Sequence, residues 1–413
     1  MTTEAAPITT TAPQLRLSQH PAFLRFLSSR VLSSMAFQGT AIAIGWLVYD
    51  RTHNAFDLGL IGLFQFLPML VLTFVVGHVA DQFDRRRIGL ICQVIEAAVV
   101  GFIALGVWQD WLTTPGIFAA VAVLGAAQAF ERPTMAALLP GLVPATMLQQ
   151  AIAVSTSFTQ TAMIIGPALG GLLYGVHPVV PFLVAAAMYI VASINVGSIP
   201  KSERIPVRSK PTLSSVFAGI AFIRSKPVML GTISLDLFAV LLGGATALLP
   251  MFALDILHAG PWALGFLRAA PAVGAVSMSL VLARWPLRHG VGNKMLLAVG
   301  IFGVATLVFA LSTSIILSIV AMLVLGAADT VSVVIRSSLV QLLTPDEMRG
   351  RVNAVNSLFI GTSNQLGEFE SGMVAGLIGP VGACVFGGLG TIAIVLLWAK
   401  LFPSLRKVDT LAG

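Results

Sequence analysis

The sequence has few charged residues. Asp, Glu, Lys and Arg make up only 10% of its 413 residues, whereas 57% are hydrophobic, and the mean hydropathy is +0.93. Soluble globular domains carry about 25% charged residues, so the composition excludes that class. Stretches of roughly 20 apolar residues, enough to cross about 30 Å of hydrocarbon, recur from Phe23 to Leu401. The sequence therefore predicts an all-α membrane protein.

Cysteine and clustered metal ligands are also scarce. The two cysteines, Cys92 and Cys384, fall inside apolar runs in opposite halves, which excludes a disulfide framework. The six histidines are scattered, and no Cys/His cluster has the spacing of a metal site. No Gly-x4-Gly-Lys-Ser/Thr loop is present to cradle nucleotide phosphates. We therefore expect a protein that is not an enzyme, with no cofactor, no bound metal and no ATP drive in this chain.

Twelve apolar runs are long enough to span a bilayer. We predict spans at about 23–49, 58–80, 88–108, 116–139, 151–174, 179–198, 228–253, 261–283, 293–312, 315–340, 353–377 and 381–401. They divide the chain into a six-helix bundle over 21–198, a linker over 199–227 and a second six-helix bundle over 228–402. Residues 1–20 are expected to be a disordered tail without the apolar core of a signal peptide, and 403–413 a second tail. Within the linker, apolar residues between Leu213 and Ser225 followed by basic ones suggest an interfacial helix.

Positive charge lies in alternate connections between these runs. Lys and Arg residues concentrate there at Arg85, Arg86, Arg87, Lys201, Arg204, Arg208, Lys210, Arg224, Lys226, Arg284, Arg288, Lys294, Arg349 and Arg351, and the intervening loops hold only Arg51. By the positive-inside rule, both termini and the linker are expected in the cytoplasm. The net charge of +7 thus points to anionic membrane lipid as a partner, and no nucleic-acid partner is expected.

The two halves of the chain repeat one another. Val123-Leu124-Gly125-Ala126-Ala127-Gln128 returns 201 residues later as Val324-Leu325-Gly326-Ala327-Ala328-Asp329. Near the start of each half an offset of 203 brings Gly62 and Pro68 onto Gly265 and Pro271. Duplicated six-span halves place a substrate site near the midplane between them, and rocking of the halves alternates access to it. The predicted fold is twelve transmembrane helices in two pseudo-symmetric six-helix halves.

Two short motifs and a segment near the end of the chain resemble those of a known family. The loop between spans 2 and 3 matches the family pattern at Gly77, Ala80, Asp81, Arg85 and Arg86, and departs from it at Val79, Gln82 and Asp84. Span 5 carries Gly166-Pro167-Ala168-Leu169-Gly170-Gly171, which resembles the Gly-Pro-x-x-Gly-Gly motif of exporters that work as antiporters. Residues 345–354 and 364–372 resemble the enterobactin-exporter-like subgroup, within the family's multidrug efflux proteins. These residues resemble the major facilitator superfamily, and the resemblance covers the whole chain after residue 20.

The resemblance implies a gating role for the first motif. Gly77, Asp81, Arg85 and Arg86 would form a cytoplasmic latch between the halves; the alternative is a topology signal, for which Arg85 to Arg87 alone would suffice. By the repeat, Gly77 and Asp81 fall on Leu280 and Arg284, so the expected gate is asymmetric.

The glycines of span 5 allow two interpretations. Gly166 and Gly170 have small-xxx-small spacing with Gly171 beside them, while Pro167 removes one helix hydrogen bond. The segment is either an ordinary glycine-rich packing surface or a bend specific to exporters.

We expect ionisable residues inside the membrane to carry the chemistry. Burial of one in lipid at a span centre costs about 2.5–3.5 kcal/mol, so these residues are expected to face the protein interior. The resemblance implies a cavity lined by spans 1, 4, 7 and 10. These spans hold the proton-coupling candidates Asp329, Asp236 and Glu131 and the cavity charges Arg30, Arg132 and Arg336. Desolvation favours the neutral form of a buried carboxyl group, which can then take up and release a proton. The alternative is internal ion pairing; Glu96, Glu368 and Glu370 rank lower, because their spans are peripheral or gating in the family.

These features predict a secondary transporter that exports small amphiphilic molecules, drug-like or siderophore-like, by proton antiport with alternating access. The resemblance implies a bacterial inner-membrane location and a monomer, with the proton gradient in place of a cofactor. Two alternatives remain: a uniporter or importer of a small metabolite, and a lipid-handling or sensor protein on the same fold.

Overall fold

The computed structural model describes residues 17–200 and 213–410, apart from the side chains at a few positions inside helices, among them Gly77 and Asp81. The first half contains α1 (Pro21–Thr52), α2 (Ala55–Gln82), α3 (Arg85–Trp108), α4 (Thr114–Leu138), α5 (Leu148–Val176) and α6 (Val180–Gly197). The second contains α7 (Leu213–Ser225), α8 (Pro227–Leu242), α9 (Leu249–Met251), α10 (Pro261–Arg284), α11 (Val291–Leu311), α12 (Ile315–Leu342), α13 (Asp346–Leu401) and α14 (Pro403–Arg406).

Within the described residues, eleven helices are long and apolar enough to cross a membrane. The last of them, α13, contains two helices that meet at a kink, where Gly379 has a φ of 79°. Gly379 adopts this left-handed conformation without steric cost, and Pro380 follows it and has no backbone N–H to donate. The predicted spans 353–377 and 381–401 lie on either side of the kink, so the twelve-span prediction is confirmed.

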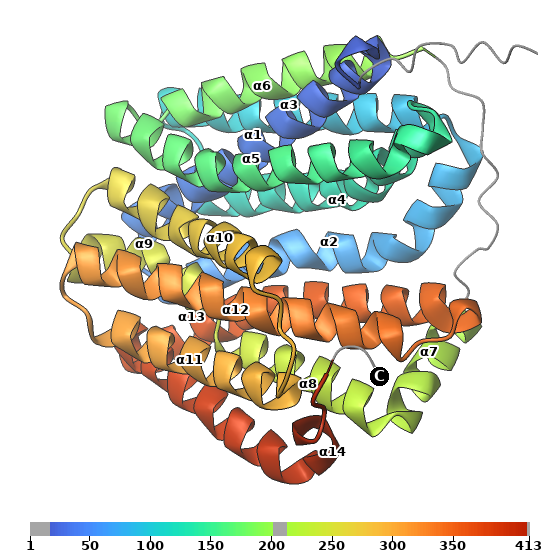
Figure 1. Cartoon of the computed structure of the whole chain (residues 1–413). Helices are drawn as coiled ribbons and strands as arrows, with labels where there is room; N and C mark the ends of the chain where they lie inside the picture. The colour runs from blue at the N-terminus through green and yellow to red at the C-terminus, as the bar shows by residue number, and fades with distance from the viewer. Residues whose placement is uncertain (1–16, 201–212, 411–413) are drawn as a thin grey trace, which may run out of the picture.

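The helices form two six-span halves, drawn from blue to green and from yellow to red in Figure 1. In the first half α3 packs on α4 and α6, and α2 packs on α4; in the second, α11 packs on α12 and α13, and α10 packs on α12. These contacts are equivalent under the repeat. The halves contact each other through α5 with α10 and through α2 with α13, which are also equivalent pairs.

The repeated segment has a glycine at the same position in each half, and close helix packing explains why both halves have it. A Cβ on Gly125 of α4 would lie 2.3 Å from the carbonyl oxygen of Gln65 in α2, and one on Gly326 of α12 would lie 2.0 Å from that of Pro271 in α10. No side chain fits at either crossing. Each half therefore uses a glycine to bring its second and fourth spans into backbone contact.

The seventh span is interrupted, although the sequence predicts one continuous helix over 228–253. The helix α8 ends at Leu242, and a short 3-10 turn (Ala245–Leu248), α9 and a π-helix (Phe252–Ile256) follow. The cause is the glycine pair Gly243 and Gly244: a Cβ on Gly244 would lie 2.4 Å from the carbonyl oxygen of Gly367. The break lets α13 approach the seventh span.

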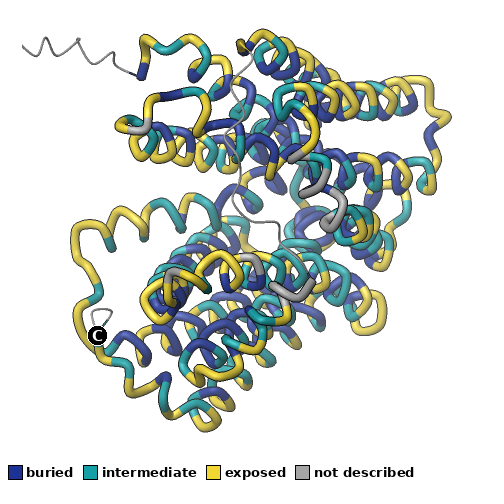
Figure 2. The backbone as a smooth tube through the Cα atoms, turned by 90° about the vertical axis from the view of Figure 1, so that its right-hand side faces the viewer, coloured by how far each residue is buried: buried dark blue, intermediate teal, exposed yellow. Residues whose placement is uncertain are grey.

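Large apolar side chains cover the outside of the molecule. Leu377, Val176 and Ile316 are each more than 70% exposed, and Figure 2 shows exposed residues along the outer surface of both halves. Such a surface is unstable in water but suits hydrocarbon. The exposed apolar surface agrees with a protein that spans a membrane many times.

The segments outside the bundles are described in part. Residues 17–19 of the predicted tail form a short 3-10 helix whose Leu17 is buried, and residues 1–16 lie outside the described residues. In the linker, α7 covers the segment predicted to be an interfacial helix and packs on α13 and α8. Residues 201–212 are not described.

We call the side where α1 begins and α13 ends the near side, and the side of the α1–α2 turn at His53 the far side. On the far side, a Cβ on Gly59 of α2 would lie 3.0 Å from the carbonyl oxygen of Phe369 and 3.2 Å from Gly372 of α13. A Cβ on Gly45 of α1 would lie 3.5 Å from the ring of Pro250 in the seventh span, an ordinary side-chain contact between the halves. The halves are thus in backbone contact toward the far side.

Candidate functional site

The Gly-Pro-x-x-Gly-Gly segment of α5 lies where the two halves meet. A Cβ on Gly170 would lie 2.6 Å from the carbonyl oxygen of Gly39 in α1, inside the first half. A Cβ on Gly171 would lie 2.5 Å from the carbonyl oxygen of Pro261 and 2.9 Å from Gly265, both in α10 of the second half. Gly171 and Gly265 therefore allow the two halves to close against each other on the far side.

A hydrogen bond adds to this far-side contact. The Tyr49 hydroxyl of α1 donates to Oδ2 of Asp255, which lies in the π-helix of the seventh span. Tyr49 is buried, whereas Asp255 is exposed. The bond joins the two halves and must break if they separate on this side.

A buried polar cluster occupies the first half. Glu131 of α4 is 5% exposed and accepts hydrogen bonds from Ser33 of α1 (2.7 Å), Gln93 of α3 (2.8 Å) and Gln128 of α4 (2.8 Å). The same Gln128 amide donates to Oε1 of Glu96 in α3, at 2.6 Å. The cluster holds two buried acids connected through uncharged donors.

The two arginines predicted to line the cavity lie beside this cluster. Arg132 is exposed; its Nε donates to Oε1 of Gln128 (2.9 Å), and its guanidinium lies 5.3 Å from the centre of the Phe37 ring. Arg30 donates to the Thr159 hydroxyl of α5, at 3.3 Å. Arg30 interacts electrostatically with Glu131 and Arg132 with Glu96, while both cations hydrogen-bond to uncharged side chains. Glu131 and Arg132 share one neighbour, Gln128.

The second half holds an ion pair at the equivalent place. Arg336 of α12 binds Asp236 of α8 with 2.7 Å between Nη1 and Oδ2, and both side chains are almost fully buried. Asp329 lies within electrostatic range of both but forms no hydrogen bond or ion pair with any residue the structure describes. Ion pairing, the alternative to a proton-coupling role, is therefore found for Asp236 but not for Asp329.

The acids of α13 have separate partners. Glu368 pairs with Arg268 of α10 at 3.5 Å, and Glu370 accepts from Ser371 at 3.4 Å. Arg268 also donates to the carbonyl oxygen of Thr246 in the seventh span. These contacts connect helices within the second half, and the two acids do not meet.

The loop motif between α2 and α3 is described only in part, because the surroundings of Gly77 and the side chain of Asp81 are not described. Arg85 donates to the carbonyl oxygen of Ala137 in α4 (2.9 Å) and Arg86 to that of Ile199 after α6 (2.7 Å). The Asp84 side chain accepts from the backbone N–H of Arg86 and so caps α3. The two arginines therefore join helix ends inside the first half, and a latch between the halves stays a prediction.

Residues 26–367 match the model of a family described as the Major Facilitator Superfamily. The chain belongs to the major facilitator superfamily. Relatives include proteins named enterobactin exporter EntS in Citrobacter koseri and in Escherichia coli O1:K1, each 26% identical over 95% of this chain and 94% of the relative.

Solved structures of transporters share the fold of this major facilitator. A bacterial homologue of the human lysosomal transporter Spinster, inward-facing and occupied, has a TM-score of 0.73 at 13% identity, covering 95% of this chain and 97% of the other. A mutant of the nucleoside transporter NupG gives 0.71 at 14% identity, covering 94% and 100%. An inward-facing bacterial homologue of ferroportin gives 0.68 at 16% identity, covering 94% and 98%.

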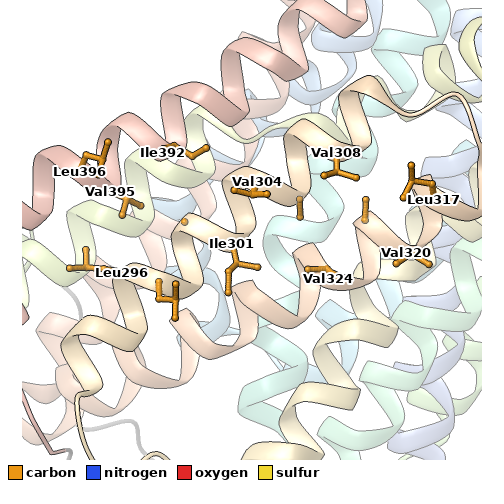
Figure 3. Close-up of a pocket in the computed structure, with 14 residues that line it drawn as sticks. Leu296, Ile301, Val304, Val308, Leu317, Val320, Val324, Ile392, Val395 and Leu396 are labelled. Atoms are coloured by element: carbon orange, nitrogen blue, oxygen red, sulfur yellow. The ribbon is translucent and has the colours of Figure 1, made fainter.

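An apolar groove of about 530 Å³ lies on the second half of this transporter, between α11, α12 and α13. Figure 3 shows its aliphatic side chains, which include Ile301, Val304, Val320 and Ile392. No polar side chain lines it to orient a ligand. We interpret it as part of the lipid-facing surface. Among the described residues, no three His, Cys, Asp or Glu side chains are placed to hold a metal ion.

Sequence reasoning missed some residues of the transporter's buried clusters. It ranked Glu96 low because span 3 is peripheral in the family, but the structure places Glu96 beside Gln128 and Glu131. The spacing of Gln128 and Glu131, three residues apart on one helix, could have indicated that their side chains meet. Nothing in the sequence indicated the Tyr49–Asp255 contact, which joins residues of different halves.

Proposed function

We propose that this transporter exports a small amphiphilic molecule, siderophore-like or drug-like, from the bacterial cytoplasm by proton antiport. The observation that carries the proposal is the contact of Gly171 with α10, which puts the motif of exporters at the interface between the halves. Relatives named enterobactin exporter, similar over almost the whole chain, support export. The near side is proposed to face the cytoplasm of a bacterium, as the positive-inside rule requires.

Acids inside the membrane would supply the proton coupling. Asp236 is held by Arg336, whereas Asp329 has no ion-pair partner among the residues the structure describes. A carboxyl group of this kind can change its charge without breaking an ion pair. Asp329 in the second half and Glu131 in the first are therefore the proposed carriers, and Asp236 is proposed to position Arg336.

The two polar clusters occupy equivalent places in the repeat. Gln128 and Asp329 are 201 residues apart, and Ser33 and Asp236 are 203 apart, the offsets found in the sequence. Duplicated halves create a site between them near the midplane. The exposed Arg132 would face a substrate there and favours a molecule with an anionic or acceptor group.

Transport by purified protein in proteoliposomes tests this function, with iron-free enterobactin and ethidium as probes. An imposed proton gradient should drive accumulation of one of the probes, and movement of the probe should dissipate the gradient. Asp329→Asn should abolish accumulation but keep downhill flux, because neutral Asn cannot exchange a proton. Asp110→Asn, at a side chain that is 90% exposed, is the control and should behave as wild type.

Other outcomes separate the alternatives. Downhill flux of either probe without proton movement in wild type would show a facilitator and would refute antiport. Binding of a probe without any flux would favour a sensor or lipid-handling protein.

A further inference from the structure

Two acids of the first half lie together in the protein interior. Glu96 of α3 is 0% exposed and Glu131 of α4 is 5% exposed. The same Gln128 nitrogen donates to Oε1 of Glu96 at 2.6 Å and to Oε2 of Glu131 at 2.8 Å, so the two carboxyl groups are adjacent. Counted from the start of α3, Glu96 lies roughly 16 Å into the membrane. A hydrogen bond between two carboxyl groups exists only when one of them carries a proton.

The hydrogen-bond donors around the two acids are unevenly divided. Glu131 accepts three hydrogen bonds, from Ser33, Gln93 and Gln128. Glu96 accepts one, from Gln128, and its Oε2 atom is buried without a partner among the described residues. Because donated hydrogen bonds stabilise the charged form of a carboxyl group, Glu131 is the better carboxylate and Glu96 the better acid.

No cation forms an ion pair with either acid in the described part of the chain. Arg132 and Arg30 act on the cluster at longer range. Two adjacent negative charges in a dry interior repel strongly. The second half differs, because Arg336 is in direct contact with Asp236 there.

Two uncharged side chains, Tyr189 and Cys92, lie near the two acids. Tyr189 of α6 is fully buried, its hydroxyl has no hydrogen-bond partner among the described residues, and it interacts electrostatically with both Glu96 and Glu131. Cys92 of α3 interacts with both acids in the same way. Both groups are ordinarily uncharged, so neither balances a second negative charge. With both acids ionised the cluster would lack a balancing positive charge, and one bound proton would supply it.

We propose that Glu96 and Glu131 form a proton-binding site that holds one proton, which rests on Glu96 and is hydrogen-bonded to the Glu131 carboxylate. Glu131, the proposed carrier of the first half, would then carry this proton jointly with Glu96. Gln128 connects this site to the exposed Arg132. Since guanidinium groups only donate, the Gln128 oxygen faces Arg132 and its two N–H groups face the acids. A substrate group that binds Arg132 would therefore disturb the donor that both acids share. The use of this proton in transport rests on the function proposed above, but its presence does not.

Infrared spectroscopy of the purified protein in lipid, near neutral pH, tests the proposal without any transport. A protonated carboxyl group gives its own C=O stretching band, which shifts in D₂O. Glu96→Gln should remove one such band, and Glu131→Gln should displace the same band, because the acceptor of the Glu96 hydrogen bond changes from a carboxylate to an amide. Asp329→Asn, in the other half, should leave this band unchanged.

The variants are designed to fold, since Gln has the shape of a protonated Glu and can donate to Glu131. A Glu96→Gln spectrum identical to wild type would show that Glu96 is ionised and would overturn the proposal. If Glu96→Gln fails to fold, an unchanged band in Glu131→Gln would also overturn it. A lost band together with absent proton-driven transport would keep the proton site and reject only the proposed function.

Discussion

At the scale of single residues, the direct partner of each buried charge decides its role. Asp236 and Arg336 neutralise each other at 2.7 Å, and Glu131 is surrounded by uncharged donors. A buried ion pair contributes little net stability, but removal of one member leaves an uncompensated charge. We therefore assign the pair in the second half a structural role, and we propose that the acids of the first half exchange a proton.

Removal of one member of the pair should destabilise the protein strongly. Asp236→Asn leaves Arg336 buried without its counter-charge, and we expect a loss of about 3–5 kcal/mol of unfolding free energy. The double variant Asp236→Leu with Arg336→Met should recover most of it, because no buried charge remains. Thermal unfolding in detergent, followed by tryptophan fluorescence, measures both. Equal destabilisation by the single and the double variant would contradict this assignment.

At the scale of helices, glycine positions decide which helices come into backbone contact. Gly125 and Gly326 bring the second and fourth spans of each half together, and Gly171 with Gly265 brings the halves together. The Gly243–Gly244 pair interrupts the seventh span in the same way. The glycines of the Gly-Pro-x-x-Gly-Gly segment are therefore both a packing surface and a contact between the halves.

A methyl group at Gly171 should open the far-side contact. In Gly171→Ala the new Cβ meets backbone atoms of Pro261 and Gly265, which cannot rotate away, so the halves cannot close there and export should fall. Gly175→Ala, one turn later in α5, is the matched control because a Cβ there meets nothing within 4 Å. Flux in proteoliposomes and the accessibility of cysteines introduced on the far side measure the effect. Equal behaviour of the two variants would refute the role of this contact.

At the scale of the whole molecule, the two halves are in contact toward the far side. The approach of α2 to α13, the approach of α5 to α10 and the Tyr49–Asp255 hydrogen bond all lie there. A conformational change that exposes the far side must break these contacts together. Removal of a group that contributes to them shifts the equilibrium between conformations by, at most, the free energy that this group contributes to the contact.

Loss of the Tyr49 hydroxyl should shift that equilibrium. A hydrogen bond to a charged group contributes about 1.5–3 kcal/mol, so Tyr49→Phe should raise the population open on the far side roughly tenfold or more. Distances between spin labels at the start of α2 and near the Gly379 kink of α13, both on the far side, report that population. Tyr174→Phe serves as the control, because the hydroxyl of Tyr174 bonds to no residue the structure describes. A wild-type distance distribution in Tyr49→Phe would contradict the prediction.

Much of the fold could be predicted because it depends on local composition. Apolar runs located the spans, and the repeat of Val123 to Gln128 indicated two equivalent halves. The break at Gly243 and Gly244 was missed, since the backbone that Gly244 lets approach, at Gly367 of α13, lies more than a hundred residues away in the sequence. Likewise Asp329 and Arg336 lie on one helix, but the partner of Arg336 comes from α8.

The sequence by itself determined the membrane class, the twelve spans, the duplication and the small set of acids inside the membrane. These features follow from hydrophobic length and from residue type, which need no neighbours. Only the tertiary structure decided which acid is paired, which two acids share a donor, and on which side the halves meet. Those properties depend on distances between helices that are remote in sequence. The energy of a buried charge changes strongly when a partner moves by a few ångströms.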